Sequence, residues 1–278
     1  MASESTVKIN NKKISFDGFW ESSLTDSSSK GLPDIELVSM DSRLHTINQI
    51  LEVTTKPMIV DGDTGGDVNQ FQHTVRILER AGVSMVIIED KVFPKRNSFA
   101  NVKQNLENID VFSNKIKGGQ NSKKNKNFMI VARLEGLIVG STMKETLIRA
   151  KKFLLAGADG IMIHSKSKNP SEILEFAKCY HAFPKELINS KILVCVPTTY
   201  NSITTSELAK AGFHIIIYAN HLLRSAYKAM EQACQNILLH DRSFEIEPSC
   251  VPIPQLFKTV GMLKIIKNDN KILKDSHG

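Results

Sequence analysis

Residues 59–65 read IVDGDTG, and this stretch decides the fold expected for the chain. The run from Pro57 to Val60 is short and apolar, as expected for a strand that is covered on both faces. Asp61 and Asp63 follow it two residues apart, so both carboxylates can face the same side. Polar side chains directly after a buried strand are typical of the carboxyl-end rim of a parallel barrel, where active sites lie.

Six more apolar runs have the character of Pro57–Val60. Each is followed by polar residues, and helical patterns separate most of them. The alternation predicts an α/β fold with a parallel sheet. Polar ends on all seven runs favour a barrel over an open doubly wound sheet, which gathers function at one switch point. The six runs are Ile14–Trp20, Val83–Ile88, Phe128–Ala132, Gly160–Ile163, Ile192–Val196 and Phe213–Tyr218.

Local signals mark the ends of the intervening helices. Thr142 and Thr204 each precede a glutamate by three residues, which is the spacing of a capping box. Asn169-Pro170 supplies an N-cap and a first-turn proline. Three Ala-Gly pairs stand directly before a predicted strand, where glycine tolerates the left-handed conformation that closes a helix. The three pairs are Ala81-Gly82, Ala156-Gly157 and Ala211-Gly212.

Seven strands are one fewer than a (β/α)8 barrel has, and residues 1–12 are polar and lysine-rich. We therefore expect a (β/α)8 barrel-like parallel sheet that lacks its first β/α unit. This barrel domain with its C-terminal helices is predicted to span residues 1–261, and a basic tail residues 262–278. An open sheet edge leaves backbone groups unpaired, which is costly. Either the chain is truncated, or another segment or subunit fills the gap.

Composition excludes several classes of protein. The chain has 278 residues, 41% of them hydrophobic, and a net charge of +7. No apolar run reaches the roughly 20 residues needed to cross a bilayer, and the N-terminus lacks the apolar segment of a secretory signal. A cytoplasmic protein that binds neither membrane nor nucleic acid is therefore expected. Lysines cluster near Lys123 and in the tail, but one Trp, four Tyr and no recognised motif accompany them.

The four cysteines are far apart in sequence, at positions 179, 195, 234 and 250. Since no two of them form a C-x-x-C pair, we expect reduced and mostly buried thiols, not a disulfide framework or a zinc site. The sequence also lacks G-x-G-x-x-G and Walker patterns, so neither a dinucleotide site nor a P-loop is predicted.

Asp61, Asp63 and Glu89 form a set of candidate metal ligands, because all three follow predicted strands. Carboxylates without neighbouring His or Cys suit Mg²⁺ or Mn²⁺ better than zinc or copper. The alternative is ordinary turn chemistry, since Asp-Gly-Asp also occurs where Asp caps a helix or a turn.

Arg133 and His164 also follow predicted strands, so they are expected at the same rim. Together they suit an anionic, phosphorylated substrate. The alternative for Arg133 is a salt bridge to Glu135. The segment 89–98, EDKVFPKRNS, follows a strand end with three cations and an Asn-Ser pair, and loops of this kind often cover substrate.

Several motifs in order resemble phosphoenolpyruvate mutase, of the isocitrate lyase/phosphoenolpyruvate mutase superfamily. The hallmark is Glu89-Asp90-Lys91, five residues, then Asn97-Ser98. The resemblance spans roughly residues 13–260. The Lys-Lys-Cys-Gly-His motif of the isocitrate lyase branch is missing, which argues against a lyase. The collinear segments are GFWESSL (18–24), Asp34, IVDGDTG (59–65), IVARLE (130–135), MIHSK (162–166), VPTTY (196–200) and ANH (219–221).

The resemblance implies a Mg²⁺-dependent isomerase that interconverts phosphoenolpyruvate and phosphonopyruvate, with Mn²⁺ as a possible substitute. It implies that Asp61 ligates the metal directly, and that Asp34, Asp63 and Glu89 hold its water ligands. The remaining implied roles concern the substrate. Its carboxylate is bound by Ser22 and the backbone of Ser23 and Leu24, its pyruvyl group packs on Trp20, and its phosphoryl group is held by Arg133 and His164 and covered by Lys95, Asn97 and Ser98.

Two alternatives to the mutase stay open. The same segments also resemble phosphonopyruvate hydrolase. The loop of that enzyme lacks the Asn-Ser pair, so Asn97-Ser98 favours the mutase. A catalytically inactive barrel that acts as a scaffold is the other, motivated by the missing first unit. Two departures from the family pattern bear on the site: Gly65-Gly66-Asp67 stands where the family usually has Gly-Tyr-Gly-Asn, and Ser23 where it commonly has Gly.

The resemblance also implies a homodimer or homotetramer in which the last helix is exchanged between subunits. Six residues spaced along one face of the final predicted helix are apolar, which suits that exchange. Packing against the core of the same subunit explains the apolar face equally well. The six are Leu223, Tyr227, Met230, Cys234, Ile237 and Leu238.

Overall fold

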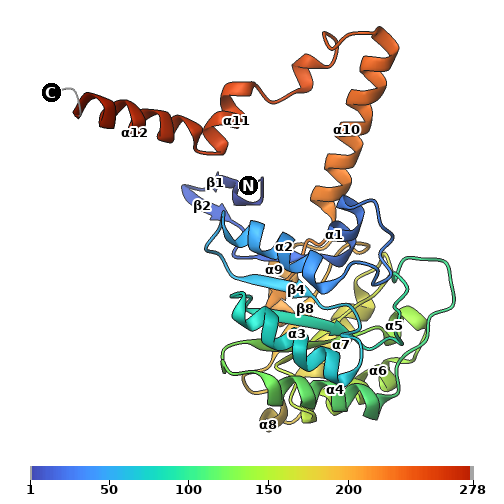
Figure 1. The fold of residues 1–278 in the computed structure, drawn as a ribbon. Helices are drawn as coiled ribbons and strands as arrows, with labels where there is room; N and C mark the ends of the chain where they lie inside the picture. The colour runs from blue at the N-terminus through green and yellow to red at the C-terminus, as the bar shows by residue number, and fades with distance from the viewer. Residues whose placement is uncertain (1, 276–278) are drawn as a thin grey trace. The chain divides into compact units, whose positions relative to one another are not determined.

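The computed structural model describes residues 2–275 (Figure 1). The chain divides into two compact units. One is Ser15–Asn220, and the other combines the chain before Ser15 with the chain from His221 onward. Helix α12 (Met262–Asp275) belongs to the second unit.

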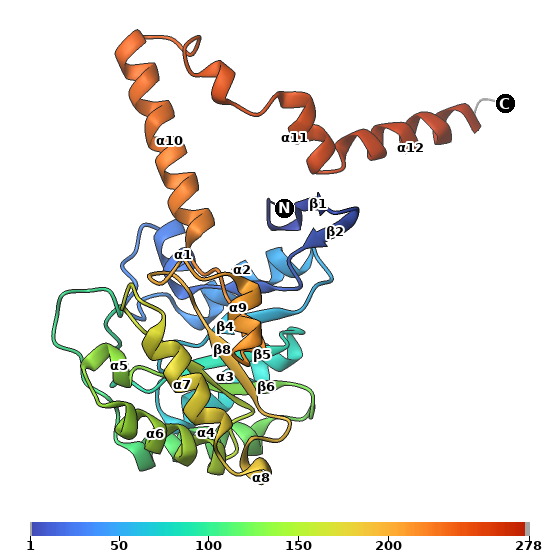
Figure 2. The same cartoon turned by 180° about the vertical axis from the view of Figure 1, so that it is seen from behind.

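The unit Ser15–Asn220 is built on a curled sheet of seven parallel strands in chain order, which confirms the α/β prediction and the number of strands (Figures 1 and 2). Within the described residues, the first and last of these strands each pair with a neighbour on one side only, so the sheet is open there. The strands are β3 (Phe19–Glu21), β4 (Met58–Asp61), β5 (Met85–Glu89), β6 (Met129–Leu134), β7 (Gly160–Ile163), β8 (Ile192–Cys195) and β9 (Ile215–Ile216).

The N-terminal segment differs from the prediction in two ways. Strand β3 begins only at Phe19, so the predicted strand Ile14–Trp20 is wrong at its start. Residues 1–12 were expected to hold no strand, but β1 (Thr6–Ile9) and β2 (Lys12–Ser15) form a separate two-stranded sheet. Asn10 and Asn11 join these strands with positive φ of 48° and 61°. Two such residues make the tight hairpin turn that matches strand twist, and asparagine tolerates it.

Most predicted helix signals are confirmed. Thr142 and Thr204 both form complete capping boxes. Gly82, Gly157 and Gly212 have φ of 89°, 103° and 94°, so each closes a helix in the left-handed conformation. The helix after Asn169-Pro170 begins one residue later than predicted, with Pro170 as N-cap, and Asn169 Oδ1 accepts a hydrogen bond from Ser171 N.

Helices surround the sheet in the unit Ser15–Asn220, and the second unit has helices of its own (Figure 2). Around the sheet lie α1 (Ser23–Ser29), α2 (Met40–Leu51), α3 (Val68–Arg80), α4 (Ile109–Ser122), α5 (Gly136–Val139), α6 (Met143–Leu155), α7 (Ser171–His181), α8 (Lys185–Ile188) and α9 (Thr205–Lys210). The second unit holds the 3₁₀ turns η1 (Ala2–Glu4) and η2 (Glu247–Ser249), and α10 (His221–His240), α11 (Ile253–Thr259) and α12.

The sheet has two apolar faces, because successive side chains of a strand point to opposite sides. Val86 and Ile88 of β5 lie in a large core with helix residues such as Phe71 and Phe153. Met85 and Ile87 alternate with them and belong to a second cluster. The side chains of this second cluster line the face on which the site lies, and they continue in Val131, Met162, Val194, Val196 and Ile217.

All four cysteines are free thiols. The expectation that most of them are buried is wrong for Cys234 and Cys250, which are exposed. No helix in residues 2–275 has the length and apolar character required to cross a membrane.

Candidate active site

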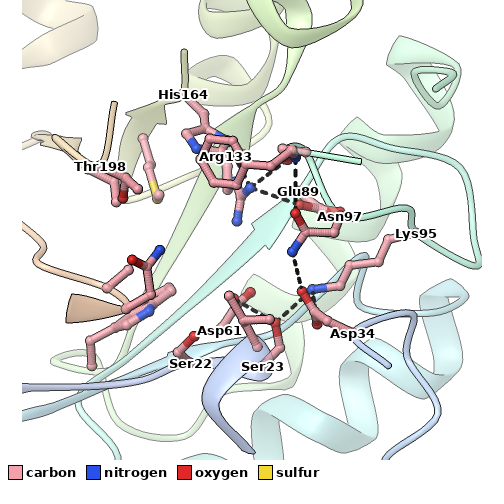
Figure 3. A pocket seen from close by; sticks show the side chains of 18 residues that line it. Ser22, Ser23, Asp34, Asp61, Glu89, Lys95, Asn97, Arg133, His164 and Thr198 are labelled. Atoms are coloured by element: carbon pink, nitrogen blue, oxygen red, sulfur yellow. Dashed lines mark hydrogen bonds and ion pairs between the residues drawn. The ribbon is translucent and has the colours of Figure 1, made fainter. Parts of the chain in front are cut away.

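A pocket of about 500 Å³ lies at the carboxyl ends of the strands in the unit Ser15–Asn220 (Figure 3). All predicted site residues except Asp63 line it, and Asp63 lines an adjoining cavity of about 200 Å³. Six further residues complete the walls of the larger pocket: Phe99, Met162, Val196, Thr198, Ala219 and Asn220.

Strand alternation places the central side chains. Each of these side chains lies two residues after a residue that packs in the second apolar cluster. It therefore points to the same face of the sheet, and it lies at the carboxyl end of its strand. Neighbouring strands bring these ends together, and Glu89 and Arg133 are direct register partners. The pairs are Ile59 and Asp61, Ile87 and Glu89, Val131 and Arg133, and Met162 and His164.

Lys95 connects the acidic side chains of the site. Its ammonium lies 2.5 Å from Asp63 Oδ1 and 2.9 Å from Asp34 Oδ1. It also donates a 2.7 Å hydrogen bond to Ser23 Oγ, and Ser23 Oγ in turn donates to Asp61 Oδ2 at 2.9 Å (Figure 3). The Ser23 side chain, which replaces the glycine of the family pattern, therefore links a lysine of the covering loop to the proposed metal ligand.

Asp61 is held ionised in this surrounding. Burial raises the pKa of the Asp61 carboxyl, but the charges of Lys95, Arg133 and Arg43 outweigh it and lower the pKa overall. Burial works the other way on Lys95, where the charges of Asp63 and Asp61 overcome it and raise the pKa of the ammonium. The site thus keeps a carboxylate and an ammonium charged although both are buried.

Arg133 and His164 form the basic side of the pocket. Arg133 Nε donates to Glu135 Oε1 at 2.6 Å, and Nη2 donates to Ser98 Oγ at 3.0 Å. The salt bridge considered as the alternative role of Arg133 is therefore present. Arg133 nevertheless lines the pocket, and no hydrogen bond within the described residues uses its Nη1. A ligand with acceptor oxygens can use this donor.

His164 Nδ1 lies 2.8 Å from Glu135 Oε1 and 2.9 Å from Arg133 Nη2. One ring nitrogen cannot donate to the first and accept from the second at once, so the tautomer decides which hydrogen bond forms. Burial, reinforced by the Arg133 charge, lowers the pKa of His164, which keeps the imidazole neutral near neutral pH. The charge of Arg133 disfavours protonation of His164, and an anion bound beside the imidazole would favour it.

Glu89 lies between the basic and the acidic side. The pKa of its carboxyl is raised to about 7, chiefly by burial. The charge of Arg133, whose Nη2 is 3.3 Å from Glu89 Oε2, offsets part of this increase, and Glu135 adds a smaller increase of its own.

The loop after β5 is fixed over the pocket by Lys91, which is 2% exposed. Its ammonium donates to Arg96 O at 2.7 Å, to Ser98 Oγ at 3.0 Å and to Gln104 Oε1 at 2.9 Å. Asn97 Nδ2 donates to Asp34 Oδ2 at 2.7 Å (Figure 3). The predicted covering loop is thus in contact with the site, and Ser98 serves as its anchor on Arg133 and Glu135.

Ser22, Ser23 and Leu24 begin helix α1, and Ser22 is its N-cap. The first amides of a helix have no partner within it, so the backbone of Ser23 and Leu24 is available to an acceptor. Trp20 is partly buried and packs against the second apolar cluster, and its Nε1 is buried without a hydrogen-bond partner among the described residues. Both features suit the carboxylate and pyruvyl contacts that the resemblance implies.

Two charged residues of this region were missed by the sequence reasoning. Arg43 of α2 is buried and joins Asp63 Oδ2 at 2.7 Å to Glu21 Oε2 at 2.5 Å. Glu36 accepts hydrogen bonds from the backbone of Thr64 and of Lys95. Arg43 lies four residues before Ile47 on the apolar stripe of its helix, and a charge in such a stripe must find a buried partner. The position of Arg43 in this apolar stripe was therefore the sequence feature that could have identified it.

The donors of the acidic side fit a hard divalent cation. Asp63 Oδ1 and Glu89 Oε1 are buried and accept no well-aligned hydrogen bond, although lysine ammonium groups lie 2.5 Å and 3.3 Å away. In the structure the ammonium of Lys95 balances the buried negative charge of Asp63. Within residues 2–275 no three Asp, Glu, His or Cys side chains converge closely enough to enclose an ion. A few carboxylate oxygens of this kind suit an ion that keeps several water ligands, as Mg²⁺ does.

Comparison with known proteins identifies the family. The model of the family described as phosphoenolpyruvate phosphomutase matches residues 3–238. A phosphoenolpyruvate phosphomutase from Tetrahymena pyriformis is 34% identical over 264 residues, which is 94% of this chain and 86% of the relative.

Two solved structures are similar to this chain over most of its length. The crystal structure of phosphoenolpyruvate phosphomutase from Streptomyces platensis subsp. rosaceus is 36% identical, with a TM-score of 0.86, over 93% of this chain and 88% of that one. Phosphonopyruvate hydrolase in complex with oxalate and Mg²⁺ is 31% identical, with a TM-score of 0.81, over 93% and 87%. The chain belongs to the phosphoenolpyruvate phosphomutase family, which is a family of isomerases.

Proposed function

We propose that this protein interconverts phosphoenolpyruvate and phosphonopyruvate by Mg²⁺-dependent transfer of the phosphoryl group within one substrate molecule. The observation that carries the proposal is a pocket in which an ionised Asp61 faces Arg133 and His164 beneath a loop that bears Lys95 and Asn97. In a member of this family, the carboxylates would hold the metal at the pyruvyl end of the substrate, and Arg133 and His164 would bind its phosphoryl end.

When bound, Mg²⁺ supplies Lewis-acid stabilisation of the enolate charge that develops on the pyruvyl group. Asp61 would hold it directly, and Asp34, Asp63 and Glu89 would hold its water ligands. The same oxygen donors suit Mn²⁺, which we propose as a substitute.

The residues of the chain bind and orient the substrate. Ser22 and the backbone of Ser23 and Leu24 hold the carboxylate, and Trp20 packs against the pyruvyl plane. Arg133 Nη1 and His164 hold the phosphoryl oxygens. A loose phosphoryl-transfer step needs positive charge and positioning more than covalent chemistry, and these groups supply both.

Exclusion of water separates a mutase from a hydrolase, because the phosphoryl group must be recaptured by the same enolate. Asn97 and Ser98 lie on the loop that Lys91 fixes over the pocket. An amide such as Asn97 can orient phosphoryl oxygens without activating water, so this loop favours isomerisation.

The proposal is tested by incubating the purified protein with phosphonopyruvate and Mg²⁺ and following the phosphorus NMR spectrum. We expect the phosphonate signal to convert to that of phosphoenolpyruvate, and excess EDTA to stop the conversion. Direct conversion to inorganic phosphate would instead assign a phosphonopyruvate hydrolase. A folded protein that leaves the substrate unchanged would contradict both activities.

We also propose that the protein is a homo-oligomer that uses α10. Helix α10 contains no buried residue in the single chain, and Tyr227, Met230, Ile237 and Leu238 are exposed. Because such a face is unfavourable in water, and the family resemblance implies exchange of the last helix, a second copy of this chain is the proposed occupant. Sedimentation equilibrium should give a dimer or tetramer at micromolar concentration, whereas a stable monomer would contradict the proposal.

The free thiols support a reducing compartment, and we propose a cytoplasmic location.

A further inference from the structure

Glu36 lies where three segments of the site meet, and none of the roles proposed above uses it. It follows Asp34 by two residues, and its backbone has a φ of 61°, in the left-handed region that a glutamate rarely adopts. Such a conformation persists where surrounding interactions determine it, and it is enriched at functional sites.

The two carboxylate oxygens of Glu36 bind two different loops. Oε1 accepts hydrogen bonds from Thr64 N at 2.9 Å and from Thr64 Oγ1 at 2.7 Å. Oε2 accepts a hydrogen bond from Lys95 N at 2.8 Å. Thr64 directly follows Asp63 in the proposed metal loop, and Lys95 lies in the loop that covers the pocket. One side chain thus joins elements that are 28 and 59 residues away in sequence.

The position of this link matters because Lys95 contacts the acidic side of the site. Its backbone is held by Glu36, and its ammonium reaches Asp63, Asp34 and Ser23. Release of the backbone would free the ammonium to leave that side and would open the loop to water. All three hydrogen bonds that Glu36 accepts go to its carboxylate, and such bonds are stronger than those between neutral groups.

We propose that Glu36 is a positioning residue that latches the covering loop to the metal loop, so that loss of the latch lets water reach the phosphoryl group during turnover. The inference about turnover rests on the proposed mutase function, whereas the latch itself does not. Glu36 touches neither reacting atoms nor the metal in this proposal, and acts through the backbone of Thr64 and Lys95.

Two variants separate the contacts. Glu36→Ala removes both. Glu36→Gln keeps one acceptor oxygen, which can still serve Thr64, but presents an NH₂ group to the Lys95 amide, which cannot accept its hydrogen bond. Glu79→Ala is the matched control, because Glu79 also accepts backbone amides of a distant segment, those of Lys124 and Asn125, outside the pocket.

The first measurement is hydrogen exchange of the Thr64 and Lys95 amides, resolved by NMR and made without substrate. We expect exchange at Lys95 to rise by about tenfold to a hundredfold in both Glu36 variants, the change expected for one lost hydrogen bond to a charged acceptor. Exchange at Thr64 should rise in Glu36→Ala and stay low in Glu36→Gln, and Glu79→Ala should alter neither amide. Wild-type exchange at Lys95 in Glu36→Ala, which removes both acceptor oxygens, would overturn the latch.

The second measurement is the fraction of turnovers that end in inorganic phosphate. We expect this fraction to rise by about tenfold in Glu36→Ala, since an open loop admits water. A merely structural role would lower the rate without changing the fraction, and that result would overturn the role in excluding water. If Glu36→Ala loses exchange protection throughout α6 as well, it has unfolded, and Glu36→Gln decides both questions.

A wild-type protein without any turnover of phosphonopyruvate would instead refute the proposed function. The exchange experiment would still test the latch.

Discussion

Asp61→Asn is expected to reduce Mg²⁺-dependent turnover of phosphonopyruvate by at least about a thousandfold, because it removes the charge that fixes the cation. The lowered pKa of Asp61 means that this carboxylate is ionised in the wild type, so the substitution deletes a full charge. The Asn side chain has the same shape and can still accept the hydrogen bond from Ser23 Oγ. The fold should therefore persist, as measured by circular dichroism.

Calorimetric titration with Mg²⁺ provides a readout that is independent of turnover, and we expect it to detect no binding to Asp61→Asn. The control is Asp110→Asn, which changes a carboxylate whose side chain is 72% exposed in α4. This control should bind Mg²⁺ and turn over as the wild type does. An Asp61→Asn variant with wild-type Mg²⁺ affinity would remove Asp61 from the metal site.

The sequence predicted the strand ends well because they depend on local patterns. Asp61, Glu89, Arg133 and His164 each follow an apolar run, and parallel strands necessarily bring such ends together. Asp63 was expected beside Asp61 through strand alternation, but it lies beyond Gly62 in a turn with a φ of 52°. It still reaches the site, because Lys95 and Arg43 hold its two oxygens.

The partners of these residues were not predictable in the same way. Glu36 and Arg43 meet the metal loop from positions 20 to 28 residues earlier in the chain, and no local spacing encodes those contacts. Charged residues at the end of a strand or within a helix only indicate that some partner is required. The hairpin β1–β2 was missed for another reason: its strands are exposed throughout, so they lack the apolar runs used to find strands.

Arg43→Met is expected to lower the free energy of unfolding by about 3–5 kcal/mol, because it leaves a buried carboxylate without its partner. Arg43 and Glu21 are both 4% exposed, and the guanidinium is shared with Asp63. Asp63 keeps Lys95 as a second partner, whereas Glu21 loses the only ion pair that residues 2–275 provide for it. Urea unfolding followed by the fluorescence of Trp20, the sole Trp, which adjoins Glu21, measures the change.

The loss should also depend on pH. Burial already raises the pKa of Glu21 although Arg43 lowers it, so removal of Arg43 should raise that pKa further. A carboxyl group whose folded pKa lies above its unfolded value loses stabilising free energy as pH rises through the interval between the two. Arg43→Met should therefore be least destabilised near pH 5 and most destabilised near pH 8, two values taken from the usual titration range of a buried carboxyl, about 4–9. An equal loss at both values would show that the uncompensated Glu21 charge is not the cause.

The double variant Glu21→Gln with Arg43→Met distinguishes charge from packing. If the cost of Arg43→Met comes from the stranded carboxylate, the neutral amide introduced by Glu21→Gln should restore most of the lost stability, to within about 1–2 kcal/mol of the wild type. If it comes from the cavity left by the guanidinium, the two losses should add. Lys152→Met is the control, since its ion pair with Asp110 is exposed, and it should leave the unfolding free energy almost unchanged. Restoration by the double variant would identify Arg43 and Glu21 as one buried ion pair, whose guanidinium also holds Asp63 at the site.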